Sequence, residues 1–124
     1  MTAPRNPRWR LQTELTLYLG MSLIKVSIVR FVDEHQPGVV ECEFPDANGI
    51  VRTVIDKTPM FTNEFLWWDS TYPVQGVLSC SVLKTWQDPS GRNLALISIA
   101  KPYYMEATDG QTEFTVVKSQ LSET

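Results

Sequence analysis

The chain has 124 residues, of which 43% are hydrophobic, and it carries a formal net charge of −3 at pH 7. This composition is typical of one globular domain and excludes an intrinsically disordered chain; two cysteines are too few for a disulfide-rich scaffold. No run of residues reaches the ~18 apolar residues of a membrane-spanning helix, so we expect no membrane partner.

The first twenty residues predict a basic, loosely ordered arm. Pro4 and Pro7 exclude an early helix. Apolar side chains at alternate positions of residues 11–19 predict that part of the arm adds an edge strand. Arginines before an apolar stretch are similar to a secretion signal, but no small-x-small cleavage site follows. We therefore expect a cytoplasmic protein, with secretion as the alternative.

Six segments after the arm alternate apolar and polar residues with the period of two that half-buried strands show. They span residues 23–32, 39–44, 50–55, 76–86, 93–99 and 112–117. Turn sequences separate them, including Pro37-Gly38 and Asn48-Gly49. The Asn48-Gly49 turn predicts a hairpin of residues 39–44 and 50–55, and the turn at residues 87–91 predicts a second one of residues 76–86 and 93–99.

Six short strands without a long helical segment predict an all-β fold with short helical turns only. We expect a small single-domain barrel over residues 21–124, since closure removes the sheet edges that promote aggregation. An OB-like, an SH3-like and a translation-factor-like barrel all satisfy this pattern.

The cysteines fall on the inward faces of their predicted strands. Cys42 alternates with Val40 and Phe44, and Cys80 alternates with Leu78 and Val82. Buried thiols commonly behave as small hydrophobic side chains, and a cytoplasm would keep them reduced. The sequence therefore predicts two core residues rather than a nucleophile or a disulfide.

The longest segment without strand character is KTPMFTNEFLWWDSTY, residues 57–72. It holds five of the chain's thirteen aromatic residues: Phe61, Phe65, Trp67, Trp68 and Tyr72. Adjacent side chains of an extended chain point to opposite sides, so one tryptophan can cover the core while the other faces outward. We predict that Phe61 and Phe65 belong to the core, that Trp68 is more exposed than Trp67, and that Trp67, Trp68 and Tyr72 contribute to binding. The alternative is that all five rings fill the open end of the barrel.

Acidic and titratable side chains give the second set of candidate residues. Glu41 and Glu43 lie two apart on one predicted strand and point the same way, which suits either a solvated sheet face or an acidic docking surface. His35, the only histidine, follows Asp33 and Glu34 beside a turn. Chemistry at these residues would require a shared pocket.

The segment FVDEHQPGVVECEF at residues 31–44, with IDKTPMFT at residues 55–62, resembles short uncharacterised bacterial all-β proteins. This resemblance implies a bacterial, cytoplasmic setting and carries no activity.

Residues 21–124 contain eight Lys or Arg against thirteen Asp or Glu. Nonspecific nucleic-acid binding depends on cations that neutralise phosphates, so this balance favours a basic protein partner. The chain has no glycine-rich phosphate loop, no G-x-S-x-G motif and no metal-spaced Cys/His set, and we expect no metal and no cofactor. The first hypothesis is thus a non-catalytic protein-binding domain of the immunity or adaptor kind. The alternatives are a single-stranded nucleic-acid-binding OB-type module and a small-ligand barrel or enzyme that uses Glu41, Glu43 and His35.

Overall fold

The computed structural model describes residues 20–34 and 37–123, and the predicted arm, apart from Gly20, lies outside them. The strands are β1 (Met21–Asp33), β2 (Val39–Pro45), β3 (Val51–Lys57), β4 (Val74–Gln87), β5 (Asn93–Ser98), β6 (Glu113–Val117) and β7 (Leu121–Glu123). Two short 3-10 turns interrupt them, η1 (Thr58–Met60) and η2 (Lys118–Gln120). The described residues contain no helix with the length and apolar character needed to cross a membrane.

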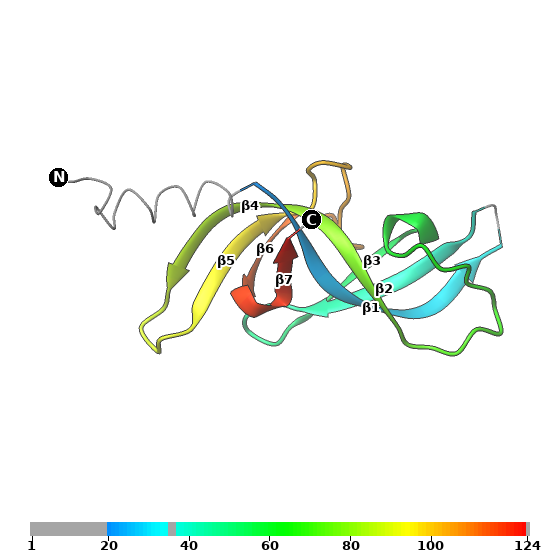
Figure 1. Ribbon diagram of the computed structural model, residues 1–124, viewed down its shortest axis with the longest axis horizontal. Helices are drawn as coiled ribbons and strands as arrows, with labels where there is room; N and C mark the ends of the chain where they lie inside the picture. Colours follow the sequence, from blue (N-terminus) through cyan, green and yellow to red (C-terminus); the bar gives the residue numbers. More distant parts are fainter. Residues whose placement is uncertain (1–19, 35–36, 124) are drawn as a thin grey trace.

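The strands form one antiparallel sheet in the order β3-β2-β1-β4-β5-β6, which curls into a half-barrel (Figure 1). The short strand β7 pairs with the first part of β1, on the side that β2 occupies further along β1. The prediction of an all-β, barrel-like fold of about six strands is confirmed.

The core lies on the concave side of this sheet and follows the predicted alternation. Ile24, Val26 and Ile28 of β1 are buried between the inward side chains of the neighbouring strands. The predicted inward residues of β2 and β4 are all buried. Burial of apolar surface at every second position fixes the register of each pair, because a slip of one residue would turn the apolar face to water.

A β-bulge changes the phase of β1 near its end. The register against β2 shifts between Ile28 and Arg30, and the next buried position is therefore Phe31. Bulges bend a strand and redirect its side chains. This one turns the ring of Phe31 inward and leaves Arg30 outside, where its guanidinium pairs with Glu41 at 2.8 Å.

The turn between β2 and β3 holds the curled sheet against β6. Asp46 Oδ1 accepts hydrogen bonds from the backbone N–H groups of Asn48 and Ile50 at 2.8 and 3.0 Å. Its Oδ2 accepts two from Arg52, at 3.1 Å from Nε and 2.8 Å from Nη2. Arg52 Nη1 donates to Gln111 Oε1 at 3.1 Å. We call Asp46, Arg52 and Gln111 the polar clasp.

Further contacts join the same parts of the chain. Ala47 N–H donates to the carbonyl of Thr115 on β6 at 2.8 Å, and Thr108 N–H donates to the carbonyl of Thr53 on β3 at 2.9 Å. The rings of Phe44 and Phe114 meet edge to face with centroids 5.4 Å apart. Within the described residues, isolated contacts such as these, rather than a β3–β6 ladder, bring the two ends of the sheet together.

Candidate functional site

The connection between β3 and β4, residues 58–73, begins at a buried threonine. Thr58 N–H donates to the carbonyl of Gly38 at 2.9 Å, and Thr58 Oγ1 donates to the same oxygen at 3.3 Å. Pro59 occupies the first turn of η1, where its fixed φ is favourable and its missing N–H costs nothing. These contacts attach the start of the connection to the turn that precedes β2.

The second part of the connection is fixed by hydrogen bonds around the backbone of Trp67. Its N–H donates to Ser70 Oγ at 2.9 Å, and its carbonyl accepts from Ser70 N–H at 3.2 Å and from the Tyr72 hydroxyl at 2.6 Å. Burial raises the pKa of Tyr72, as does the charge of Asp69, while a hydrogen bond with Ser70 opposes the shift. The hydroxyl of Tyr72 therefore remains protonated at neutral pH and can keep donating to Trp67.

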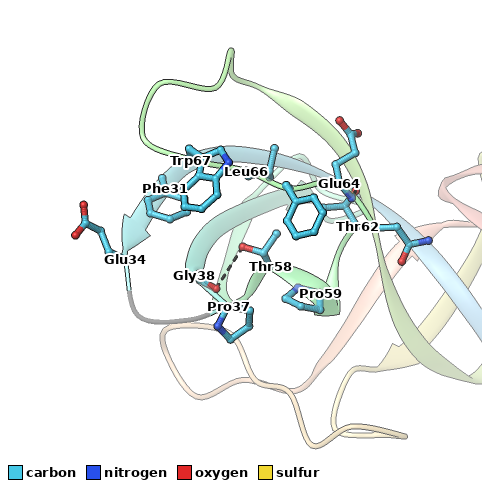
Figure 2. Close-up of a pocket in the computed structure, with 12 residues that line it drawn as sticks. Phe31, Glu34, Pro37, Gly38, Thr58, Pro59, Thr62, Glu64, Leu66 and Trp67 are labelled. Carbon is cyan, nitrogen blue, oxygen red and sulfur yellow. Dashed lines mark hydrogen bonds between the residues drawn. The ribbon is translucent and has the colours of Figure 1, made fainter.

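A cavity of about 260 Å³ lies between this connection and the end of β1 (Figure 2). Its floor is made of buried residues: Phe31, Gly38, Thr58 and Leu66. Its rim is made of exposed residues, among them Glu34, Glu64, Phe65 and Trp67. The cavity is thus mainly apolar inside and has carboxylates at its edge.

Gly38 shapes the floor because it has no side chain. Its φ is +95°, and an added Cβ would lie 3.1 Å from two ring carbons of Phe31. A positive φ favours glycine, and the close approach requires it here. The Pro37-Gly38 turn therefore allows the Phe31 ring to reach the cavity.

Trp68 covers the other side of Phe31. The two rings meet edge to face with centroids 5.0 Å apart, and Trp68 Nε1–H donates to Glu34 Oε1 at 2.6 Å. The tryptophan is thereby held over the end of β1 while 57% of it stays exposed.

Three large aromatic side chains of the connection are exposed to solvent. Phe65 is 90% exposed, Trp67 54% and Trp68 57%. We call these three residues the aromatic rim. Large apolar side chains gathered on a surface are typical of contact regions.

The charges around the aromatic rim are mostly negative. Asp33, Glu34, Asp56, Glu64 and Asp69 lie in or directly beside the segments that build the cavity. Within residues 33–34 and 56–69, Lys57 is the one cation. These segments therefore carry five carboxylates and one amine, a net charge of −4. This surface attracts cations and repels phosphate groups.

The predictions for individual aromatic residues have different outcomes. Phe61 is in the core, with 1% of its surface exposed, as predicted. The prediction that Phe65 belongs to the core is wrong, because the chain between Thr62 and Leu66 turns Leu66 inward and Phe65 outward. Trp68 is more exposed than Trp67, but the difference is too small to distinguish their roles.

The acidic candidates do not meet at the cavity. Glu41 and Glu43 lie half-buried on the outer face of β2, and Glu41 pairs with Arg30 there. Neither of them lines this cavity, and His35 lies outside the described residues. Of the three aromatic residues predicted to contribute to binding, only Trp67 lines the cavity; Tyr72 donates a hydrogen bond to the backbone carbonyl of Trp67, and Trp68 packs on Phe31.

Both cysteines are free and fully buried, as predicted. Burial raises the pKa of each thiol to about 12, and the charge of Glu41 adds to the shift at Cys42. A thiol with so high a pKa is protonated at neutral pH and is a poor nucleophile. The described residues also bring no three His, Cys, Asp or Glu side chains into a metal-holding group.

Sequence reasoning did not predict the cavity itself. Phe31 was assigned to a strand and Gly38 to a turn, and nothing in their spacing indicated that the two would meet Thr58 and Leu66. The available signal was the Pro37-Gly38 pair, since such a turn beside an aromatic strand end permits a close approach of backbone to a ring. Glu34 was noted in its turn but was not connected with Trp68.

No protein-family model, curated protein or solved structure matches this chain.

Proposed function

We propose that this chain is a non-catalytic protein-binding domain that captures a basic partner through the aromatic rim. The observation that carries this proposal is the exposure of Phe65, Trp67 and Trp68 beside an apolar cavity with carboxylates at its edge. Tryptophan and other aromatic side chains supply much of the binding energy at protein interfaces. A bacterial cytoplasm is the setting that the resemblance of residues 31–44 and 55–62 favours, and an immunity or adaptor role is the form that such binding would take there.

The fixed backbone of the connection supports a binding role. The hydrogen bonds of Ser70 and Tyr72 hold the backbone of Trp67, and the contacts with Phe31 and Glu34 hold Trp68. Side chains that are already ordered lose less entropy when a partner arrives. The ring of Trp68 is therefore presented at a low cost in conformational entropy, and the backbone that bears Trp67 is already fixed.

The charge of the site supports a basic protein over a nucleic acid. Aromatic rings can stack on bases, but single-strand binders combine them with a positively charged groove. Here the rings are surrounded by carboxylates, with Lys57 as the single cation of residues 33–34 and 56–69. Electrostatic complementarity would instead accelerate association with a basic surface.

The test is affinity capture from cells that naturally make the protein, with three forms of the full chain. We expect wild type to retain a stoichiometric partner rich in Lys and Arg, and the double variant Trp67→Ala/Trp68→Ala to lose it. Trp86→Ala is the matched control, because this half-buried tryptophan lies on the β4–β5 hairpin, at the opposite end of Figure 1 from the connection.

Retention of the partner by the double variant would contradict the proposal, as would the absence of any stoichiometric partner. Titration of wild type with single-stranded oligonucleotides at low salt addresses the nucleic-acid alternative. We expect tryptophan emission to stay unchanged, and a saturable change would favour that alternative.

A further inference from the structure

We propose that the cavity receives the side chain of an arginine from the partner, an inference that rests on the proposed protein-binding function and names the group that is recognised. The aliphatic part of the arginine would contact the apolar floor. Its guanidinium would lie at the rim, between the rings of Phe65 and Trp67 and the carboxylates of Glu34 and Glu64.

The size of the cavity favours one side chain. Its volume of about 260 Å³ lies just below the ~300–1,000 Å³ typical of pockets that enclose drug-sized molecules. This volume suits one extended side chain. The buried floor formed by Phe31, Gly38 and Leu66 supplies apolar contacts for its methylene groups.

The charge of the lining favours a cation. Among the described residues that line the cavity, two are carboxylates, Glu34 and Glu64, and none is Lys or Arg. Glu34 uses Oε1 to accept from Trp68, and no described residue donates to its Oε2. Glu64 has its backbone N–H bonded to Thr62 Oγ1, and no described residue pairs with its carboxylate. Both groups are therefore available to a ligand that brings N–H donors.

The aromatic walls favour arginine over lysine. A guanidinium is planar, is more weakly hydrated than an ammonium group and stacks on aromatic faces. It also donates in several directions, so it can reach one carboxylate while it stacks on a ring. Phe65 and Trp67 line the cavity together with Glu34 and Glu64, so stacking and ionic partners belong to the same lining.

The test uses short peptides as probes and the full chain as receptor. Acetyl-Gly-Arg-Gly-amide is compared with peptides that carry lysine or citrulline in the central position, because citrulline keeps the shape of arginine and lacks its charge. Binding is followed through the NMR signals of the Gly38, Thr58 and Leu66 amides and of the Trp67 indole. We expect saturable shifts with arginine, weaker binding with lysine and the weakest with citrulline, and a loss of affinity as salt rises.

Variants locate the binding. Glu34→Gln and Glu64→Gln should each weaken the arginine peptide about two- to fivefold, as expected for exposed ion pairs. Trp67→Ala should weaken it by a similar factor through loss of stacking. Glu113→Gln is the matched control, since Glu113 is exposed on β6 and does not line the cavity. The amide spectrum of each variant verifies that it remains folded.

Equal affinity for the arginine and citrulline peptides would overturn the inference, as would tighter binding of lysine or the absence of saturable shifts at the cavity. This failure is distinguishable from failure of the proposed function. A partner that is lost with Trp67→Ala/Trp68→Ala and retained by Glu34→Gln/Glu64→Gln would leave protein binding in place and remove the arginine from the cavity.

Discussion

The polar side chains of the clasp bond to groups within the protein, whereas the rings of the aromatic rim are exposed to solvent. In the clasp, the carboxylate of Asp46 accepts four hydrogen bonds and is nearly enclosed by the turn it organises. In the rim, three large rings remain in water although the neighbouring Leu66 is buried.

Stability and function therefore depend on different parts of the molecule. Within the described residues, no buried side-chain nitrogen or oxygen lacks a hydrogen-bond partner, so the polar groups of the fold are satisfied internally. At the aromatic rim, by contrast, exposed apolar surface lies beside carboxylates that are available to a partner. We therefore expect substitutions in the core and the clasp to change stability, and those in the rim to change binding.

The largest effect is expected for Phe61→Ala. Phe61 is the buried aromatic residue of the connection, and loss of its ring leaves a cavity, which typically costs about 3–5 kcal/mol in the free energy of unfolding. Urea unfolding or thermal melting measures the loss, with Trp68→Ala measured beside it. Equal, large losses in both variants would show that the connection only closes the barrel, and the comparison would fail.

Asp46→Asn should come next. The amide can still accept from the turn, but Arg52 loses its ionic partner, and hydrogen bonds to charged groups are worth about 1.5–3 kcal/mol. Asp69→Asn is the control, since Asp69 is an exposed carboxylate beside the rim, and it should change the free energy of unfolding by less than about 0.5 kcal/mol. Urea unfolding at neutral pH compares them, and equal stabilities would contradict the role of the clasp.

Acid should also lower the free energy of unfolding, through Asp46 of the clasp and through Asp88. Burial alone would raise the pKa of Asp46, but hydrogen bonds from Ile50, Arg52 and Asn48 and the charge of Arg52 hold it below its usual range. The pKa of Asp88 is lowered to about 2, chiefly by hydrogen bonds from the Ser90 side chain and the Arg92 backbone. Burial opposes this lowering, and the Arg92 side chain adds to it.

Because both carboxyl groups bind protons less readily in the folded state, their stabilisation is fully present above the unfolded pKa of about 3.9. It is lost as the pH falls from there through the folded values. Urea unfolding between pH 5 and about 2 should show this decline, and Asp46→Asn/Asp88→Asn should flatten it. An unchanged acid profile in the double variant would assign the decline to other carboxylates.

Gly38→Ala tests how the cavity floor is built. The strain of an alanine at φ +95° and its contact with Phe31 should together cost about 1–3 kcal/mol. Gly49→Ala is a matched control, with φ +81° and nothing within 4 Å of the added Cβ. Urea unfolding should show the larger loss of stability for Gly38→Ala. Tryptophan emission should also change in this variant, because the ring of Trp68 packs on the ring of Phe31. Equal losses would mean that the contact with Phe31 is unimportant.

The smallest effect on stability is expected for Trp67→Ala. More than half of this side chain is exposed, and the hydrogen bonds of Trp67 belong to its backbone. Thermal melting should therefore detect a change equivalent to about 0.5 kcal/mol or less, although partner capture is weakened. A loss comparable with that of Phe61→Ala would place the Trp67 ring in the core.

The strands could be predicted because their signal is local. Alternation along residues 39–44 and 76–86 depends only on which side chains face water, and the observed β2 and β4 cover both segments. Strand β7 was not predicted, since three residues are too few to show a period. Its position depends on pairing with β1, which is distant in the sequence.

The candidate site could be predicted only in part. The density of aromatic residues indicated that the connection is a candidate binding site. The direction of the Phe65 side chain depends on the path of the backbone between η1 and the Trp67–Ser70 turn, and hydrogen bonds determine that path. The bulge in β1 was not predicted, although the sequence carries a signal for it. The adjacent apolar residues Ile28 and Val29 interrupt the alternation before Arg30 and Phe31, and the pairing with β2 shifts its register at this point.

The pairing of β1 with β7 has a consequence for how the protein folds. Ser22 Oγ donates to the carbonyl of Ser122 at 2.6 Å, across 100 residues of chain. Contacts between residues so far apart in sequence form late, because the chain must lose the entropy of closing a long loop first, and β-rich domains of this kind fold in about milliseconds to seconds. During synthesis, the edge of β1 that pairs with β7 therefore stays open until Leu121 and Ser122 have been made. We expect this interval to be the period in which the nascent chain is most exposed to aggregation and to chaperones.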